Sequence, residues 1–384
     1  MMPTYKRWPI ELTHGRGVRL FDRDGRSYID MFAGIAVASV GHSHPAVVAA
    51  ISSQAARLIH VSNLYRTGGQ VELARRLSEL TSGKLSFFTN SGAESIECAL
   101  KLARKWASSS HGPKRTRVIA AEGGFHGRTF GALAATGQPA KQEPFAPMLP
   151  GFTHVPYGSI DALGEAIGDD VAAVLLEPIQ GEAGVIVPPD GYLTAARSLC
   201  DEWGALLIVD EVQTGLGRTG TWFGYDHDGI TPDIVCLAKA LAAGLPMGAC
   251  LASPDIAAAF SLGDHATTFG GGPVQSEAAC AVLDVVTSEG LVEHAGKAGA
   301  RLMDGLRGIF AGGSTVRGRG LLIGVELERP IARQTTERAL QEGILINDPT
   351  PNVLRLAPPL VITHDEIDDA LDILEEVWRE VGAA

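Results

Sequence analysis

The sequence predicts an α/β protein, with a large domain around a mostly parallel central sheet and a smaller α+β domain. The middle of the chain alternates short apolar runs with segments of helical periodicity, which is typical of strand–helix–strand units in a parallel sheet. After about residue 275 the pattern changes to longer helical stretches separated by short strand-like runs. The length of 384 residues is sufficient for a large core in such a fold.

Five apolar runs in the middle are expected to be strands of the sheet. They are LSFFTN (85–90), RVIAAE (117–122), AAVLLEP (172–178), ALLIVDE (205–211) and DIVCLAK (233–239). Each run ends in polar or charged residues, and ligands of open α/β sheets bind at the carboxyl ends of the strands. One edge of the sheet should therefore gather Asn90, Ser91, Glu122, Glu177, Asp210 and Lys239.

The last third of the chain is expected to form the smaller domain. Its strand-like runs are TVRGRGLLIGVEL, ILIND and NVLRLAP. A final helix begins after Thr363, whose side chain can form a capping box with Glu366, and its apolar residues recur on one face. We assign this helix a purely structural role.

Composition and charge exclude several classes of partner. The formal net charge is -12 and there is no basic cluster with interleaved aromatic residues, so nucleic acid is not expected. The longest apolar stretch, around MFAGIAVASV, is far shorter than the ~20 residues of a membrane span. The N-terminus has two basic residues but no apolar run behind them, so no signal peptide is expected. The five cysteines are scattered among apolar neighbours, which indicates small buried residues in a reducing compartment rather than disulfides or a metal site. A soluble, cytoplasmic protein is predicted.

The segment NSGAES (90–95) follows the expected strand LSFFTN and begins a helix. Ser91 and Glu94 can form a capping box, which would explain both residues. Gly92 and Ala93 leave the amides of the first helical turn unshielded, and such amides bind phosphate with the help of the helix dipole. The two interpretations remain open from this segment alone.

The letters GLGRTG (215–220) match the glycine fingerprint of dinucleotide-binding loops. That fingerprint needs its first glycine at the end of a strand and an apolar helix directly after the third. Here DEVQT lies between the strand and the first glycine, and TWFGYDHDGITPD, which cannot begin a helix, follows the third. We therefore reject a nicotinamide site.

Asp210 and Lys239 each close an apolar strand, where a charge is poorly placed unless it is paired or used. One interpretation is a salt bridge between the two side chains. The other is a cofactor held between them, because a carboxylate can pair with a pyridinium nitrogen while a lysine amine forms a Schiff base with an aldehyde. Pyridoxal 5'-phosphate (PLP) fits this second interpretation, since its phosphate would find a site at NSGAES.

Several segments together resemble the class III, ornithine-type aminotransferases. These are DRDGRSYIDMFAGIAVASVGHSHPAV, NSGAES, GGFHGRT, EPIQGEAG, DEVQTGLGRTG, CLAKAL, TTFGGGP, VRGRGLLIGVEL and VLRLAPPL, and the similarity covers essentially the whole chain. The resemblance implies a PLP-dependent transferase fold of type I and a homodimer with active sites at the subunit interface. It also implies a small domain built from residues 1–45 and 276–384, with a large PLP-binding domain over residues 46–275.

The resemblance also implies roles for individual residues. Lys239 would carry the cofactor and act as catalyst, and Asp210 would pair with the ring nitrogen. The other cofactor-binding residues would be Ser91, Gly92, Ala93, Phe125, Glu211, Val212, Gln213 and, from the neighbouring subunit, Thr268. Residues facing the substrates would be Arg128, Glu182, Thr267 and Arg355, and no metal is expected. For His126, a structural and a functional role both remain open.

The reaction implied by the resemblance is a ping-pong transfer of an amino group. The expected donor is N-acetylornithine, reacting at its terminal amine, with 2-oxoglutarate as acceptor, in arginine biosynthesis. Ornithine, GABA, succinylornithine or carrier-bound lysine are alternative donors. Ala38 and Gly272 depart from the residues that relatives usually carry in segments lining the active site, so the donor stays open. An aminomutase of the same fold, or a scaffold without activity, are the other classes considered.

Overall fold

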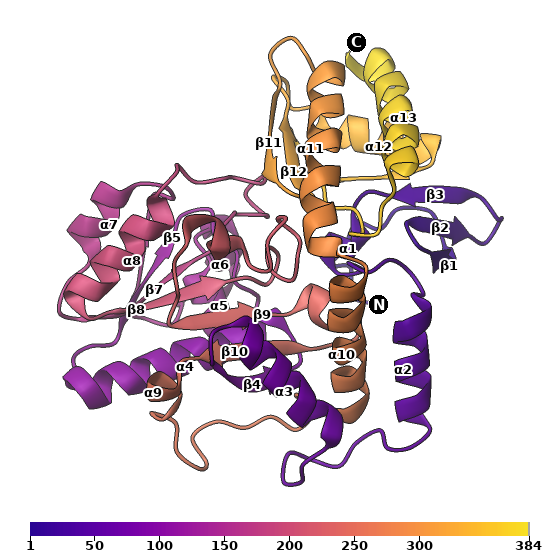
Figure 1. Cartoon of the computed structure of the whole chain (residues 1–384). Helices are drawn as coiled ribbons and strands as arrows, with labels where there is room; N and C mark the ends of the chain where they lie inside the picture. The colour runs from indigo at the N-terminus through magenta and orange to yellow at the C-terminus, as the bar shows by residue number, and fades with distance from the viewer. Residues whose placement is uncertain (383–384) are drawn as a thin grey trace.

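The computed structural model describes residues 1–382 and contains a seven-stranded sheet as its largest element (Figure 1). In spatial order the strands are β4 (Leu85–Thr89), β10 (Gly248–Ala252), β9 (Ile234–Leu237), β8 (Leu206–Asp210), β7 (Val171–Leu176), β5 (Arg117–Ala121) and β6 (Phe152–Val155). All run in the same direction except β10, which is antiparallel to both of its neighbours. The predicted mostly parallel sheet is confirmed.

All five predicted strands are present, and two further strands, β6 and β10, were not predicted. β6 (FTHV) lies at an edge of the sheet and has only four residues, with two adjacent polar residues between two apolar ones. β10 (GACLA) is fully buried but begins with glycine, which usually weakens a strand. Short runs of this kind cannot be distinguished from loop or helix by periodicity alone.

Helices cover both faces of this sheet, so that the central strands are buried on both sides. One core contains α4 (Gly92–His111), α5 (Phe130–Ala135) and α9 (Pro254–Ala257). The core on the opposite face contains α3 (Gly68–Leu80), α7 (Ile160–Ala166), α8 (Tyr192–Trp203) and part of α10 (Pro273–Ser288). Burial on both faces explains why β7 and β8 read as continuous apolar runs in the sequence.

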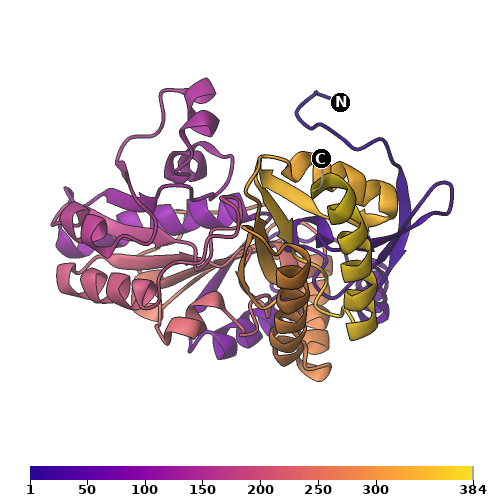
Figure 2. The same cartoon turned by 90° about the horizontal axis from the view of Figure 1, so that it is seen from above.

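The two ends of the chain meet in a second part of the molecule, which lies beside the large sheet in Figure 2. The parallel pairing of β3 (Ser27–Asp30) with β13 (Ile344–Leu345) joins the ends in one sheet, together with β1 (Leu12–Arg16) and β2 (Arg19–Asp22). A second sheet contains β11 (Thr315–Arg319), β12 (Leu322–Glu326), β15 (Val353–Leu356) and β14 (Asn347–Thr350). Helices α11 (Leu291–Ile309), α12 (Ala332–Glu342) and α13 (His364–Gly382) complete this part (Figure 1).

The connection between the two parts is α10, against which α2 (Pro45–Ala55) packs. The expected boundary at residues 275/276 falls inside α10, in its first turn. The division into residues 1–45, 46–275 and 276–384 therefore stays a prediction.

The final helix and the cysteines match their expected structural roles. Glu366 accepts hydrogen bonds from the Thr363 backbone and hydroxyl, and donates its own backbone N–H to that hydroxyl, which completes the capping box of α13. All five cysteines are free and buried. Across residues 1–382, none of the helices combines the length and apolarity that crossing a membrane requires.

Candidate active site

A cavity of about 440 Å³ opens at the carboxyl edge of the large sheet. Its wall includes residues that follow β4, β5, β7, β8 and β9, as the sequence predicts for a ligand site in an open α/β sheet. The predicted site residues in this wall are Ser91, Gly92, Ala93, Phe125, Arg128, Glu182, Asp210, Val212, Gln213 and Lys239.

The first turn of α4 forms one end of the cavity. Ser91 is the N-cap residue, and its hydroxyl accepts a hydrogen bond of 3.2 Å from the backbone N–H of Glu94. The Glu94 carboxylate accepts hydrogen bonds from the backbone and the side chain of Asn90, so the return bond reaches one residue beyond the expected capping box. The backbone N–H groups of Gly92 and Ala93 have no acceptor among residues 1–382. Capping and anion binding are therefore compatible in this turn, because different donors serve each.

Two glycines allow the chain to come close together at this end. A Cβ on Gly92 would lie 3.0 Å from Cγ1 of Val212, and one on Gly127 would lie 2.6 Å from Cβ of Ala93. Gly127 also has a φ of 136°, which side chains with a Cβ rarely adopt. The loop that carries Phe125 and Arg128 can therefore pass directly against the first turn of α4.

Asp210, the last residue of β8, is paired with His126 and not with Lys239. His126 Nδ1 lies 2.8 Å from Asp210 Oδ2, and Oδ1 accepts a bond of 3.0 Å from the backbone N–H of Val212. Burial acts to lower the pKa of His126, but the hydrogen bond and the charge of Asp210 outweigh it and raise that pKa. The Asp210–Lys239 salt bridge considered from the sequence is absent from the described residues, and Asp210 keeps acceptor capacity toward the cavity.

Lys239 lies two residues beyond β9, at the start of the 3-10 helix η3 (Lys239–Ala242), with a φ of 42°. Within residues 1–382 its amine has no hydrogen-bond or ion-pair partner. Burial lowers the pKa of Lys239, and the positive charge of Arg355 lowers it further, against the opposing effect of Glu182. A lowered pKa increases the fraction of neutral amine, which is the nucleophilic form.

Arg355 lies behind the cavity wall and is only 2% exposed. Its Nη1 donates to Glu182 Oε1 at 2.7 Å and to Gln213 Oε1 at 3.2 Å, while Nε and Nη2 donate to Asn347 Oδ1 at 3.1 and 2.7 Å. Burial acts to raise the pKa of Glu182, but the neighbouring Arg355 lowers it below its ordinary value. Because Glu182 lines the cavity and Arg355 does not, Glu182 separates this guanidinium from the cavity.

A second arginine, Arg128, is exposed at the mouth of the cavity. Its Cζ lies 5.6 Å from the centroid of the Phe125 ring, which lines the same cavity. The backbone N–H of Phe125 donates a 3.0 Å hydrogen bond to Glu177 Oε2, and burial raises the pKa of Glu177 to about 7. This hydrogen bond holds the backbone of Phe125 in place at the mouth of the cavity.

Besides Arg355, three of the predicted site residues do not line the cavity in this single chain. Thr267 borders the N-terminus of α4, where its hydroxyl lies 3.3 Å from Asn90 Nδ2. Thr268 is exposed and borders a separate groove with residues 60–63. Glu211 is directed away from the cavity, because its carboxylate accepts hydrogen bonds from the Thr214 hydroxyl and from two backbone N–H groups of residues 224 and 225.

The comparisons with known proteins agree with this geometry. The model of the aminotransferase class-III family matches residues 1–378. The chain belongs to the class III aminotransferases. The acetylornithine aminotransferase of Caldanaerobacter subterraneus subsp. tengcongensis is 50% identical, over 99% of this chain and 98% of the relative. The protein of the same name from Mycobacterium tuberculosis is 49% identical, over 100% of this chain and 95% of the relative.

Solved structures confirm the predicted fold. An ornithine aminotransferase from Toxoplasma gondii superposes with a TM-score of 0.96 at 36% identity, over 100% of this chain and 93% of that structure. An acetylornithine aminotransferase from Elizabethkingia anophelis gives 0.89 at 34% identity, over 98% and 96%. This class III aminotransferase therefore has the PLP-dependent transferase architecture that the resemblance implied.

The GLGRTG segment has a structural role in this class III chain. Arg218 is fully buried and donates hydrogen bonds to the backbone carbonyls of Leu321 and Pro358. The next helical element is only a short 3-10 helix, η2 (Gly224–Asp228). The loop connects the large sheet to the C-terminal part, and the rejection of a dinucleotide loop agrees with this geometry.

Some residues of the site carried no clear signal in the sequence. His126 follows Phe125 in a glycine-rich loop, and only the fold brings it to Asp210, 84 positions away. Asn347 and Arg355 both lie in runs that were expected to be strands, ILIND and NVLRLAP, but the register that places them opposite each other in the β14–β15 pair could not be predicted from their spacing. Lys141 lies near Phe125 and belongs to a four-residue helix, Pro139–Gln142, which was not predicted from the sequence.

Proposed function

We propose that this chain is a PLP-dependent aminotransferase that transfers the terminal amino group of N-acetylornithine to 2-oxoglutarate. The observation that carries the proposal is the unpartnered amine of Lys239 in a cavity that also contains Asp210 and two open helix amides. The acetylornithine aminotransferase names of relatives at about 50% identity support the choice of donor.

The residues present fit PLP. Gly92 and Ala93 offer open amides for the phosphate at a helix N-terminus. The carboxylate of Asp210, oriented by His126, suits a protonated ring nitrogen. The remaining contacts would come from Phe125 and Val212 on the ring faces, Gln213 at the ring hydroxyl and Lys239 at the aldehyde, with Ser91 supporting the phosphate turn. When bound, PLP supplies an electron sink for the carbon that loses a proton. We leave Glu211 out of the proposed site, because among residues 1–382 its carboxylate accepts hydrogen bonds only from residues 214, 224 and 225 of the segment that follows β8.

Lys239 has the position and chemistry of the general base and acid. Its lowered pKa makes the neutral amine available to accept a proton from the substrate carbon, and the resulting ammonium can return that proton. Positioned proton transfer of this kind contributes about 10²–10⁴-fold in rate. Asp210 would keep the ring nitrogen protonated throughout, while His126 keeps the carboxylate oriented.

The two substrates carry different numbers of carboxylates, and the two arginines can accommodate this difference. The acceptor 2-oxoglutarate has two carboxylates, whereas N-acetylornithine has one, far from its reacting amine. Arg128 would bind the distal carboxylate of either molecule, with Thr267 nearby. Arg355 would bind the carboxylate beside the reacting carbon of the acceptor, because a guanidinium captures carboxylates in a bidentate manner. Glu182 neutralises Arg355 during the donor half-reaction and would move aside for the acceptor.

We further propose a cytoplasmic homodimer. Five free, buried cysteines suit a reducing compartment. Thr268 lies outside the cavity of its own chain, and we propose that the partner's Thr268 reaches the phosphate at Gly92 and Ala93. Dimer formation and cofactor affinity would then be linked.

Ornithine is the second candidate donor, because the Toxoplasma gondii neighbour is an ornithine aminotransferase with a TM-score of 0.96. The test is a set of steady-state rates with PLP and 2-oxoglutarate, across N-acetylornithine, succinylornithine, ornithine and GABA. N-acetylornithine should have the highest kcat/KM. Equal or higher kcat/KM with ornithine would overturn the assignment of the donor, and turnover independent of 2-oxoglutarate would indicate an aminomutase.

A further inference from the structure

Lys141 lies beside the proposed site but has no role in the function proposed above. It belongs to the short helix α6 (Pro139–Gln142), whose N-cap residue Gln138 donates a hydrogen bond to the Gly123 carbonyl in the loop that carries Phe125 and Arg128. Its Nζ lies 5.7 Å from the centroid of the Phe125 ring, and the Arg128 guanidinium lies 5.6 Å from the same centroid. Two cations therefore flank the ring that forms part of the cavity wall.

The Lys141 ammonium is half-buried and only partly satisfied. It donates one hydrogen bond to Oε1 of Gln138, and no carboxylate of residues 1–382 lies within salt-bridge distance. Burial lowers the pKa of Lys141; the negative charge of Glu182 opposes this and the positive charge of Arg128 adds to it. Lys141 is not part of the cavity wall, but Phe125 is, and the contact with this ring places the Lys141 ammonium beside the cavity with donors to spare.

We propose that Lys141 determines the preference for an N-acylated donor, by donating a hydrogen bond to the acyl oxygen while Arg128 holds the donor's carboxylate. This inference rests on the proposed function, because it assigns the recognition of the donor's distal end.

Charge and hydrogen-bonding geometry determine which group each cation takes. The donor brings one carboxylate, and the planar fork of Arg128 matches it better than a point-like ammonium does. The acyl oxygen is neutral, and a lysine donor can serve it without a second negative charge. At the distal end of an N-acyl amino acid, Arg128 thus binds the carboxylate and Lys141 binds the acyl oxygen.

The same pair of cations works against free ornithine. Removal of the acyl group leaves an α-ammonium, which would lie close to both Arg128 and Lys141. Like charges in a partly desolvated site repel each other more strongly than in water. Lys141 therefore favours the acylated donor and disfavours the free one, so that attraction and repulsion both contribute to specificity.

The experiment compares Lys141→Met and Lys141→Arg with a matched control, Lys114→Met, at an exposed lysine. The holoenzymes are assayed with N-acetylornithine and with ornithine. Inhibition constants are measured for N-acetylnorvaline and pentanoate, which lack the terminal amine and differ in the acetamido group.

Lys141→Met should lower kcat/KM for N-acetylornithine roughly 10-fold or more, mainly through KM, because a hydrogen bond to a charged group is lost. The rate with ornithine should stay constant or rise, and the preference for N-acetylnorvaline over pentanoate should fall by a similar factor. Lys141→Arg should retain most of this preference, and Lys114→Met all of it.

If Lys141→Met lowers the rates with both donors by one factor and leaves the inhibitor preference unchanged, Lys141 only supports the Phe125 ring and the inference is wrong. The inhibitor comparison also separates this inference from the proposed function. A wild-type enzyme that prefers ornithine would overturn the proposed donor, whereas the effect of Lys141 on the acetamido preference would still be measured directly.

Discussion

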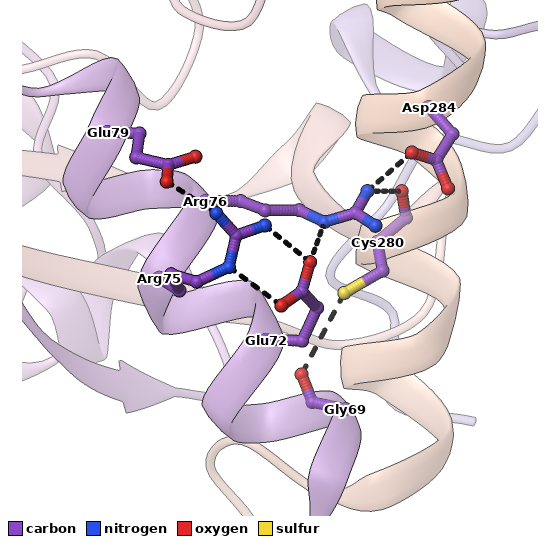
Figure 3. A network of polar contacts seen from close by, with 7 residues as sticks. All are labelled: Gly69, Glu72, Arg75, Arg76, Glu79, Cys280 and Asp284. Atoms are coloured by element: carbon purple, nitrogen blue, oxygen red, sulfur yellow. Dashed lines mark hydrogen bonds and ion pairs between the residues drawn. The ribbon is translucent and has the colours of Figure 1, made fainter.

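Two groups of charges in this molecule differ in how completely they are paired. Figure 3 shows the first, the surface network, which consists of Glu72, Arg75, Arg76, Glu79 and Asp284 on α3 and α10. Every member has a partner of opposite charge, and the side chains are 26–65% exposed. Hydrogen bonds from Arg75 and Arg76 lower the pKa of Glu72 to about 2.

The second group is the cavity network, which consists of Asp210, His126, Lys239, Glu182 and Arg355. Here Arg355 is 2% exposed, and the Lys239 amine has no partner in the described residues. Exposed pairs contribute at most about 1 kcal/mol each, whereas an unpaired buried charge costs more than that. Complete pairing of charges is therefore typical of a structural network, and incomplete pairing indicates a place where a ligand completes the interactions.

The largest expected effect comes from removing the unpaired amine. Lys239→Ala should lower kcat by about 10⁴-fold or more, because both the proton transfer and the covalent attachment of the cofactor are lost. Circular dichroism should show an intact fold, and PLP should still bind through the phosphate turn. Lys114→Ala at an exposed lysine serves as control. Borohydride reduction that still attached PLP to the variant would show that another lysine carries the cofactor.

The next effect tests whether the Glu182–Arg355 pair is fixed or acts as a gate. Glu182→Ala frees Arg355 to bind α-carboxylates in both half-reactions. Glutamate, and ornithine reacting at its α-amine, should gain on N-acetylornithine by roughly 10-fold or more, because the uncompensated guanidinium favours a carboxylate beside the reacting carbon. Single-turnover rates of the PLP form with each donor provide the measurement.

Glu122→Ala, at an exposed position on the same edge of the sheet, should leave these ratios unchanged. A uniform slowing of all donors by Glu182→Ala would identify a fixed structural ion pair instead of a gate.

Residues that close long apolar strands were the most predictable part of the site. Asp210 and Lys239 stand out because a charge after four or more buried apolar residues has few alternatives to pairing or function. The partner of Asp210 was not predictable, because His126 comes from another loop and its approach depends on the β5–β7–β8 order of the sheet. The orientation of Glu211 away from the cavity was not predictable, because adjacent residues beyond a strand end point in different directions. The position of Thr268 relative to the cavity of a neighbouring subunit could not be predicted, because a single sequence does not show how two chains pack.

The buried carboxylate of Glu211 and the surface carboxylate of Glu72 should respond to pH in opposite ways. Burial raises the pKa of Glu211 to about 7, although three hydrogen bonds oppose it. This folded pKa lies above the unfolded value, so the contribution of Glu211 to stability is complete below about pH 4.5 and is lost as the pH rises through 7. Between pH 5 and pH 8.5 that loss amounts to roughly 2 kcal/mol.

Urea unfolding of the cofactor-free protein at the two pH values measures this loss. Glu211→Gln should be less destabilising at pH 8.5 than at pH 5, by that difference. The pKa of Glu72 is lowered, so its contribution is lost only as the pH falls from 4.5 through about 2, and Glu72→Gln should cost the same at both pH values. A pH-independent cost of Glu211→Gln would show that Glu211 stays ionised in the folded protein.

The smallest effect is expected from the surface network itself. Arg76 connects two helices, because its Nε donates to Glu72 on α3 at 2.7 Å while its Nη1 donates to Asp284 and to the Cys280 carbonyl on α10. Arg75 pairs only within α3. Arg76→Met should therefore lower the free energy of unfolding by about 1 kcal/mol or less, and Arg75→Met by less than that.

The salt dependence of the free energy of unfolding distinguishes the ion-pair contribution of Arg76 from a loss of packing. Surface ion pairs are screened when the ionic strength rises, so the cost of Arg76→Met should shrink at about 1 M salt, where the Debye length is only about 3 Å. The variant keeps apolar contact through its methylene groups, which limits the part of the cost that salt cannot remove. Its kcat/KM should equal that of the wild type, because all members of the network have partners and none lines the cavity. A salt-insensitive loss of several kcal/mol, or a drop in turnover, would mean that the α3–α10 contact supports the active site and that complete pairing does not separate structural from functional charges in this protein.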